Sequence, residues 1–148
     1  MSEANKRIPR RVFEEVITQH KLELVYELFA PEYTFYDPLV DDLIRGPDGF
    51  KDLIAMYLKA VPDVHVTVDA QLAEGDMVAT RWTVRGTHTG DLLGIPPTGK
   101  RYVLPGVLIS RIKNGKIVQD WEYRDDLGLL RQLGAVVLPS DKQKKSGR

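Results

Sequence analysis

The sequence predicts an α+β domain in which three helices come first and pack on one face of a curved, mostly antiparallel sheet. Apolar residues recur at helical spacing over the first third of the chain and alternate with polar residues over the rest. Turn residues separate the alternating segments. Because helices precede strands, the order favours an α+β arrangement over repeated β-α-β units.

Size and composition limit the class of protein. The 148 residues suit one domain, which we expect over residues 1–137, followed by a polar, frayed tail over 138–148. Lysine plus arginine equals aspartate plus glutamate at 21 each, so the basic excess typical of nucleic-acid-binding domains is missing. The absence of cysteine excludes thiolate metal sites. No apolar run suits a membrane helix and no signal peptide is recognisable, so we expect a cytoplasmic location.

The helical part contains three apolar faces. The first two are made by Val12, Val16 and Ile17, and by Leu22, Val25, Tyr26, Leu28 and Phe29. Pro31 should end the second helix, and the aromatic segment that follows should be extended as far as Pro38. Pro47 suits the first turn of the third helix. The apolar face of that helix consists of Phe50, Leu53, Ile54, Tyr57, Leu58 and Val61.

Four alternating segments predict two β-hairpins. Residues 62–73 and 77–88 flank a tight turn over residues 74–76. Residues 103–112 and 116–123 flank Asn114-Gly115, which is typical of a two-residue type I′ turn. In a regular ladder this turn pairs Ile112 with Ile117, and Leu108 with Trp121.

Strict alternation in the second hairpin sorts its side chains onto two faces. The face that we expect the helices to cover carries Leu104, Gly106, Leu108, Ser110, Ile112, Ile117, Gln119, Trp121, Tyr123 and Asp125. The opposite face carries Val107, Ile109, Arg111, Val118, Asp120, Glu122 and Arg124. Such a mixture of apolar and charged residues is typical of a sheet-to-sheet homodimer contact.

Asp125 is the first candidate for acid/base chemistry. On the face of Trp121 and Tyr123, burial would raise the pKa of its carboxyl group toward the range useful to a general acid or base. The alternative is that Asp125 caps the helix that follows, since aspartate is a favoured N-cap residue. Spacing alone favours the cap, although Asp126 competes for that position and would leave Asp125 free.

His88 and Arg81 are weaker candidates. A single histidine between a strand and a loop more often holds the loop through hydrogen bonds than takes part in catalysis. A bulge over residues 84–86 would bring Arg81 to the same face as His88, where the arginine could bind a carboxylate, phosphate or enolate oxygen. Otherwise Arg81 is a solvated surface residue. No histidine has a metal-ligand spacing, so no metal site is expected.

The segments GTHTGDLLGIPPTGK and GVLISRIKNGKIVQDWEYRDDLGLLRQLG together resemble the SnoaL-like polyketide cyclase (ester cyclase) family. The resemblance extends from LVYELFAPEYTFYDP to Gly134. It implies the cone-shaped α+β fold of the nuclear transport factor 2-like superfamily. It also implies an intramolecular aldol condensation of a polyketide that requires neither a metal nor a cofactor.

The resemblance further implies roles for individual residues. Asp125, in the pattern W-x-x-x-D, matches the acid/base aspartate, and His88 and Arg81 match positions at the pocket. Many members have histidine where this chain has Tyr36. The catalytic residues are therefore expected to be Asp125 and His88. The residues expected to contact the substrate are Arg81, Trp121, Tyr123, Tyr36, Tyr57 and Leu108.

Two other functions remain open. The superfamily includes non-catalytic modules that bind small molecules or dimerise, and its members commonly form homodimers through the outer face of the sheet. It also includes epoxide hydrolases, which need a second carboxylate and an arginine arranged around a water molecule. Asp37 and Arg81 are the residues that we would assign to that arrangement.

Overall fold

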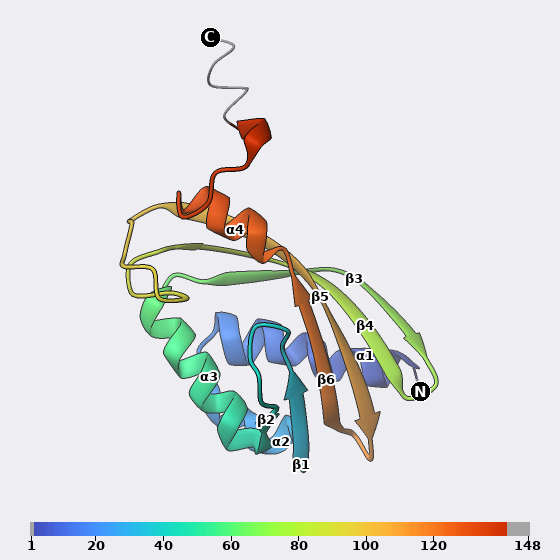
Figure 1. Cartoon of the computed structure of the whole chain (residues 1–148). Helices are drawn as coiled ribbons and strands as arrows, with labels where there is room; N and C mark the ends of the chain where they lie inside the picture. The colour runs from blue at the N-terminus through green and yellow to red at the C-terminus, as the bar shows by residue number, and fades with distance from the viewer. Residues whose placement is uncertain (1, 142–148) are drawn as a thin grey trace.

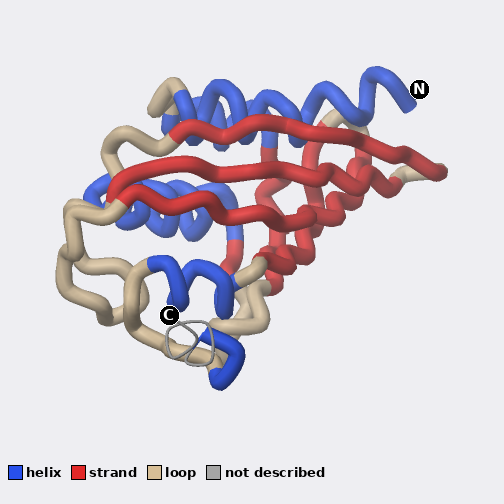
Figure 2. Tube along the Cα trace, turned by 90° about the horizontal axis from the view of Figure 1, so that it is seen from above, coloured by secondary structure: helices blue, strands red, loops and turns tan. Residues whose placement is uncertain are grey.

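The computed structural model describes residues 2–141 and contains one curved six-stranded sheet with helices on its concave side (Figures 1 and 2). The N-terminal helical elements are α1 (Ser2–Arg11), η1 (Val12–Thr18), η2 (Leu22–Leu24), α2 (Val25–Leu28) and α3 (Gly46–Ala60). The strands are β1 (Phe29–Tyr36), β2 (Ile44–Arg45), β3 (His65–Glu74), β4 (Met77–Thr87), β5 (Arg101–Lys113) and β6 (Lys116–Arg124), and α4 (Asp126–Gln132) follows. The predicted α+β class is confirmed.

The strands lie in the order β2-β1-β6-β5-β4-β3, and every neighbouring pair is antiparallel except β1 and β6. The parallel pair places the first strand beside the last. Within β1, the register with β6 shifts between Phe29 and Thr34, and Pro31 lies in this interval. A proline has no N–H to donate, so the interruption accommodates it. The second helix therefore ends at Leu28, three residues before the proline that was expected to end it.

The core fills the space between the sheet and the helices. Side chains on the concave face of the sheet, which we call the inner face, contact η1, α2 and α3 and include the fully buried Phe29, Tyr33, Val78 and Ile117. Burying a large apolar side chain contributes about 1.5–3 kcal/mol, so this layer supplies most of the favourable free energy of folding. None of the helices within residues 2–141 is long and apolar enough to cross a membrane.

The β5–β6 hairpin begins as predicted and then changes register. Asn114 and Gly115 have φ values of 52° and 75°, as a type I′ turn requires, and Ile112 pairs with Ile117. Arg111, however, pairs with Gln119, which leaves Val118 unpaired as a β-bulge.

This bulge inverts the expected faces of β6. Leu108 pairs with Glu122 instead of Trp121, because a shift of one residue moves every later side chain to the other face. Asp120, Glu122 and Arg124 therefore lie on the inner face, and Trp121 and Tyr123 lie on the outer face. The assignment for β5 is correct: Leu104, Leu108 and Ile112 are buried.

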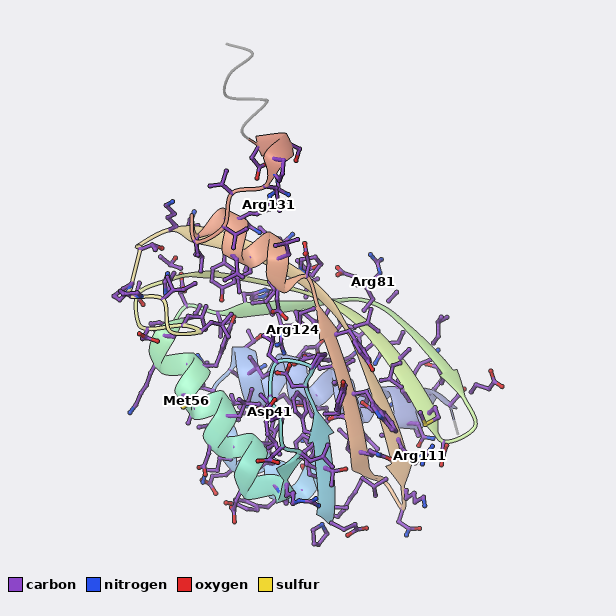
Figure 3. All side chains as sticks on the ribbon, viewed as in Figure 1. Asp41, Met56, Arg81, Arg111, Arg124 and Arg131 are labelled. Carbon is purple, nitrogen blue, oxygen red and sulfur yellow. The ribbon has the colours of Figure 1, made fainter. Side chains whose placement is uncertain are left out.

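The prediction of a bulge in β4 over residues 84–86 is also wrong. Strand β4 pairs with β5 without a shift from Met77 to Thr87, and the irregularity lies instead in β3, between Val68 and Ala70. Arg81 consequently stays on the outer face and is exposed. Figure 3 shows its side chain directed away from the interior, in which Arg124 lies.

Helix α4 lies beside the N-terminal part of β5. Beyond Gly106, β5 has no strand beside it on the β6 side, and α4 takes that place. The Gln132 side chain of α4 donates to the Val103 carbonyl oxygen at 2.8 Å and accepts from the Val103 N–H at 2.8 Å. Of the expected tail, Asp141 pairs with Arg131, and residues 142–148 lie outside the described part of the chain.

Candidate functional site

Arg124 is the centre of a buried group of charges at the end of β6. Its guanidinium donates to both carboxylate oxygens of Asp37, at 2.9 and 3.0 Å, and to Glu122 at 2.7 Å. Its Nε donates to Asp126 at 3.1 Å. We call Arg124, Asp37, Glu122 and Asp126 the Arg124 cluster. Asp37 follows β1 directly, so the parallel pairing of β1 with β6 brings these residues together.

Glu122 is the member of this cluster suited to proton transfer. Burial raises the pKa of its carboxyl group to about 7, while Arg124 opposes the rise and the charge of Asp37 adds to it. The Glu122 side chain is 16% exposed, compared with 8% for Asp37. A partly exposed carboxyl group that titrates near neutral pH can both accept and donate a proton.

Asp120 lies two residues earlier on the same face but in a closed environment. The Tyr33 hydroxyl donates to one of its oxygens at 2.6 Å, and the Ser110 hydroxyl donates to the other at 2.6 Å. Asp120 is 1% exposed, and burial raises the pKa of its carboxyl group to about 7 although both hydrogen bonds oppose the rise. With both oxygens occupied, Asp120 is positioned to hold β6 against β1 and β5.

Two of the expected substrate-contacting residues lie inside the cone. Leu108 is buried on the inner face and stands opposite Glu122. The hydroxyl of Tyr57, on α3, is hydrogen-bonded to the hydroxyl of Tyr102. Burial raises the pKa of both phenols, so they remain protonated at neutral pH.

Asp125 serves as the N-cap of α4. Its side chain accepts a hydrogen bond from the Gly128 N–H at 2.9 Å, and it is exposed to solvent. A Cβ atom at residue 128 would lie 2.2 Å from Oδ2 of Asp125, so glycine is needed for this close approach. The expectation that Asp125 lies on the inner face is wrong, and the cap is the alternative that the structure favours. Its catalytic role stays a prediction.

His88 holds the long loop between β4 and β5. It is fully buried, with Nδ1 2.9 Å from the Thr98 hydroxyl oxygen and Nε2 3.1 Å from the Ile95 carbonyl oxygen. A carbonyl only accepts, so Nε2 carries the proton and Nδ1 accepts, also from the Thr98 N–H at 3.3 Å. Both ring nitrogens are therefore engaged by the loop. A catalytic role for His88 stays a prediction.

The remaining expected substrate contacts lie on the outer face. Tyr36 and Tyr123 are 39% and 49% exposed and stack loosely, with 6.2 Å between their ring centroids. Trp121 packs under the Arg111 guanidinium, 5.8 Å from its ring centroid. Arg81 is exposed on the same face. The structure therefore does not bring these four residues to Glu122.

Sequence reasoning missed Asp37 as the partner of Arg124, and it assigned Glu122 and Arg124 to the wrong face. The run Asp120, Glu122, Arg124 does alternate with the period of a strand, but such charges are typical of a solvated face. No residue near Val118 signals the bulge: the turn and the apolar alternation look regular on both sides of it.

Two of the hollows on the surface of the described residues are lined by residues outside the Arg124 cluster. One, of about 450 Å³, is lined by residues that include Asp63, His65, Arg85 and Arg101, and the other, of about 420 Å³, lies between η1 and β3. Glu122 lines neither of them. Within residues 2–141, no three histidine or carboxylate side chains are grouped to hold a metal ion.

Comparison with known proteins places the chain in a family. The model of the SnoaL-like polyketide cyclase family matches residues 8–133. The nogalonic acid methyl ester cyclase of Streptomyces nogalater is 31% identical over 111 residues, which is 74% of this chain and 83% of that protein. The structure of TsrD from Streptomyces laurentii superposes with a TM-score of 0.82 at 29% identity, covering 92% of this chain and 98% of that one.

A further relative is the aklanonic acid methyl ester cyclase DauD of Streptomyces sp. (strain C5), which is 32% identical over 92 residues. That match covers 62% of this chain and 57% of the relative. The chain therefore spans less than two thirds of the length of this curated relative.

Proposed function

Because the chain belongs to the SnoaL-like polyketide cyclase family, we propose that it is a cofactor-independent enzyme that closes a ring in a hydrophobic polyketide ester by an aldol-type reaction. A related isomerisation would use the same chemistry. One observation carries the proposal: Glu122 has a carboxyl pKa raised by burial to about 7, is partly exposed, and is held by Arg124. The matched cyclases of methyl esters support the class of substrate.

The proposed reaction needs one group that moves a proton in both directions. The Glu122 carboxylate takes a proton from the carbon between two carbonyl groups, and an enolate forms. The enolate carbon attacks a second carbonyl carbon of the same molecule, forming the carbon–carbon bond, and the new alkoxide regains the proton from Glu122. The proton balance closes without a co-reactant. A pKa near 7 keeps both forms of Glu122 populated at neutral pH.

Arg124 supports this role by holding Glu122 in place. Its bidentate contact with Asp37 fixes the guanidinium, and the 2.7 Å contact to one Glu122 oxygen leaves the other oxygen for the substrate. Leu108, opposite Glu122, and Tyr57 on α3 are proposed to contact the apolar part of the substrate. Asp125 and His88 are the competing candidates from the sequence.

A matched pair of amide variants separates Glu122 from Asp125. Glu122→Gln keeps the shape and the contact to Arg124 but cannot transfer a proton, so we expect at least about a hundredfold loss of kcat. Asp125→Asn retains a good N-cap, so kcat should stay within about threefold of wild type. Turnover is measured on the methyl esters of aklanonic and nogalonic acid, with melting temperature as the folding control. The opposite pattern would restore Asp125 as the acid/base.

Hydrolysis of an epoxide is a second candidate, favoured by the placement of Arg124 between the carboxylates of Asp37 and Glu122. The residues first assigned to it, Asp37 and Arg81, are not brought together. Glu122 would take a proton from a water that opens the epoxide, and the protonated acid would neutralise the alkoxide. Diol formation from styrene oxide, without ring closure of either ester, would select this function. Binding of the esters without turnover would select a non-catalytic binding module.

We also infer a homodimer formed through the outer face of the sheet. The bulge adds Trp121 and Tyr123 to Val107 and Ile109 on that face, which makes it more apolar than alternation suggested. Sedimentation should therefore give a dimer, and Tyr123→Glu should shift it to a monomer. A monomeric wild type at micromolar concentration would contradict this inference. A cytoplasmic location stays a prediction.

A further inference from the structure

Trp82, on β4, has a buried hydrogen-bond donor without an acceptor. The residue is 2% exposed, and its Nε1 has no hydrogen-bond partner among the described residues. Buried polar groups are nearly always paired, because leaving a donor unpaired forfeits the hydrogen bond it makes with water. An exception inside the cone therefore calls for an explanation.

The indole lies in the same cross-strand row as Arg124. Trp82 pairs with Gly106 on β5, and Gly106 pairs with Arg124 on β6. A Cβ atom at residue 106 would lie 2.3 Å from Cζ2 and 2.8 Å from Cε2 of Trp82. These atoms belong to the six-membered ring of the indole, so Gly106 lies against that ring. Only glycine permits this approach.

Several polar groups on the inner face are bonded to other donors. Thr80 accepts a hydrogen bond from the Gln71 amide at 3.1 Å. Asp120 is bonded by two hydroxyl groups, and Arg124 occupies Asp37 and one oxygen of Glu122. The indole also packs against Phe13, with 6.0 Å between the ring centroids, and a phenyl ring carries no acceptor oxygen. The protein itself thus provides no partner for Nε1.

We propose that Trp82 Nε1–H donates a hydrogen bond to an oxygen of the molecule that the cone binds. The inference rests on the proposed function to the extent that it assumes a ligand inside the cone. An indole donates and never accepts, so the matching ligand atom is a carbonyl or enolate oxygen of an otherwise apolar molecule. A neutral donor in a dry site stabilises an enolate more than a carbonyl, because negative charge develops on that oxygen.

The two tryptophans of the chain provide a direct test with an internal control. In the ¹⁵N-labelled Glu122→Gln variant, the indole N–H signals of Trp82 and Trp121 are followed while aklanonic acid methyl ester is added. We expect the Trp82 proton to move downfield and to exchange more slowly with solvent. Trp121, on the outer face under Arg111, should not respond. Since this variant is not expected to turn over, the measurement reports ligand contact alone.

Three outcomes overturn the proposal. The Trp82 signal could stay in place while other inner-face signals shift, or it could already be downfield and protected without ligand, which would assign an internal water as its partner. Absence of binding by both the aklanonic and the nogalonic ester would also overturn it. Full turnover by Glu122→Gln would instead contradict only the acid/base assignment, because the contact of Trp82 with the ligand would still be read from the spectrum.

A kinetic comparison distinguishes a substrate contact from a structural role. Trp82→Phe retains a buried ring and removes the donor, so kcat/KM should fall about tenfold, mainly through kcat. The melting temperature should fall more than that of Trp121→Phe, the matched substitution on the outer face, because the smaller ring leaves space in the core. A large loss of melting temperature with unchanged kcat/KM would show that the indole only fills the core.

Discussion

Asp120 and Glu122 stand two residues apart on the inner face of β6, and burial raises the pKa of both carboxyl groups to about 7. Their surroundings nevertheless differ. Two hydroxyl groups occupy both oxygens of Asp120, which is 1% exposed. Glu122 is held by a single cation, and its side chain is 16% exposed.

This difference shows that a shifted pKa does not by itself identify a reactive group. Burial alone can produce the shift, and it does so at both positions. What separates Glu122 is that only one of its oxygens has a hydrogen-bond partner among the described residues and that its side chain is more exposed. The carboxyl group of Asp120 instead accepts hydrogen bonds that connect β6 with Tyr33 on β1 and Ser110 on β5.

The largest loss of stability should follow from removing the positive charge of the Arg124 cluster. Arg124→Met leaves Asp37 and Glu122 buried without their partner, so the free energy of unfolding should fall by about 3–5 kcal/mol. Urea denaturation measures the loss. Arg111→Met is the matched control, since Arg111 is 39% exposed on the outer face and should change stability by about 0.5 kcal/mol or less. Equal effects of the two substitutions would contradict the assignment of a buried cluster.

We call Asp120, with the hydroxyl groups of Tyr33 and Ser110 that bond it, the closed site. Titration of Asp120 should appear in the pH dependence of the free energy of unfolding. A raised carboxyl pKa means that the folded state binds the proton more tightly than the unfolded chain, so stability falls as pH rises. For Asp120 the decrease should begin near pH 4, continue to about pH 7 and then level off, with a total on the order of 4 kcal/mol. Asp120→Asn should remove this contribution and leave that of Glu122, whose pKa is also raised to about 7. An unchanged slope in the variant would rule out Asp120 as its source.

The hydrogen bonds of the closed site can be weakened one at a time. Tyr33→Phe removes the donor at 2.6 Å from buried Asp120 and should cost about 1–2 kcal/mol, with kcat within about twofold of wild type. Tyr26→Phe is the control, because the Tyr26 hydroxyl donates to Asp48 at the surface, where Tyr26 is 46% exposed. Loss of activity in Tyr33→Phe would mean that the two carboxylates work together.

The smallest effect should come from the exposed carboxylate outside both sites. Asp125→Ala removes the N-cap of α4 and should lower the free energy of unfolding by about 1 kcal/mol. Thermal denaturation of this variant beside Asp125→Asn separates the cap from the charge. If the asparagine variant is as unstable as the alanine variant, the hydrogen bond to Gly128 is not the stabilising contact.

Much of the architecture could be predicted from local chemistry. Pro47 lies in the first turn of the third helix as expected, the hairpin at Asn114-Gly115 has the expected turn, and β5 buries the expected residues. The candidate site could be predicted only in part. Leu108 and Tyr57 lie on the inner side as expected, and their contact with a substrate stays a prediction. Trp121 and Tyr123 were assigned to the wrong face because the ladder was assumed to be regular.

The sequence by itself determined what depends on a few neighbouring residues: helical faces, the turn at Asn114-Gly115, and the capacity of Asp125 to cap a helix. Only the tertiary structure decided which face of β6 is buried, because the bulge at Val118 depends on how the curved sheet fits its neighbours and not on a local preference. It also decided that Arg124 meets Asp37, 87 positions away in the chain. Such a contact follows from the parallel pairing of β1 with β6, which no short segment specifies.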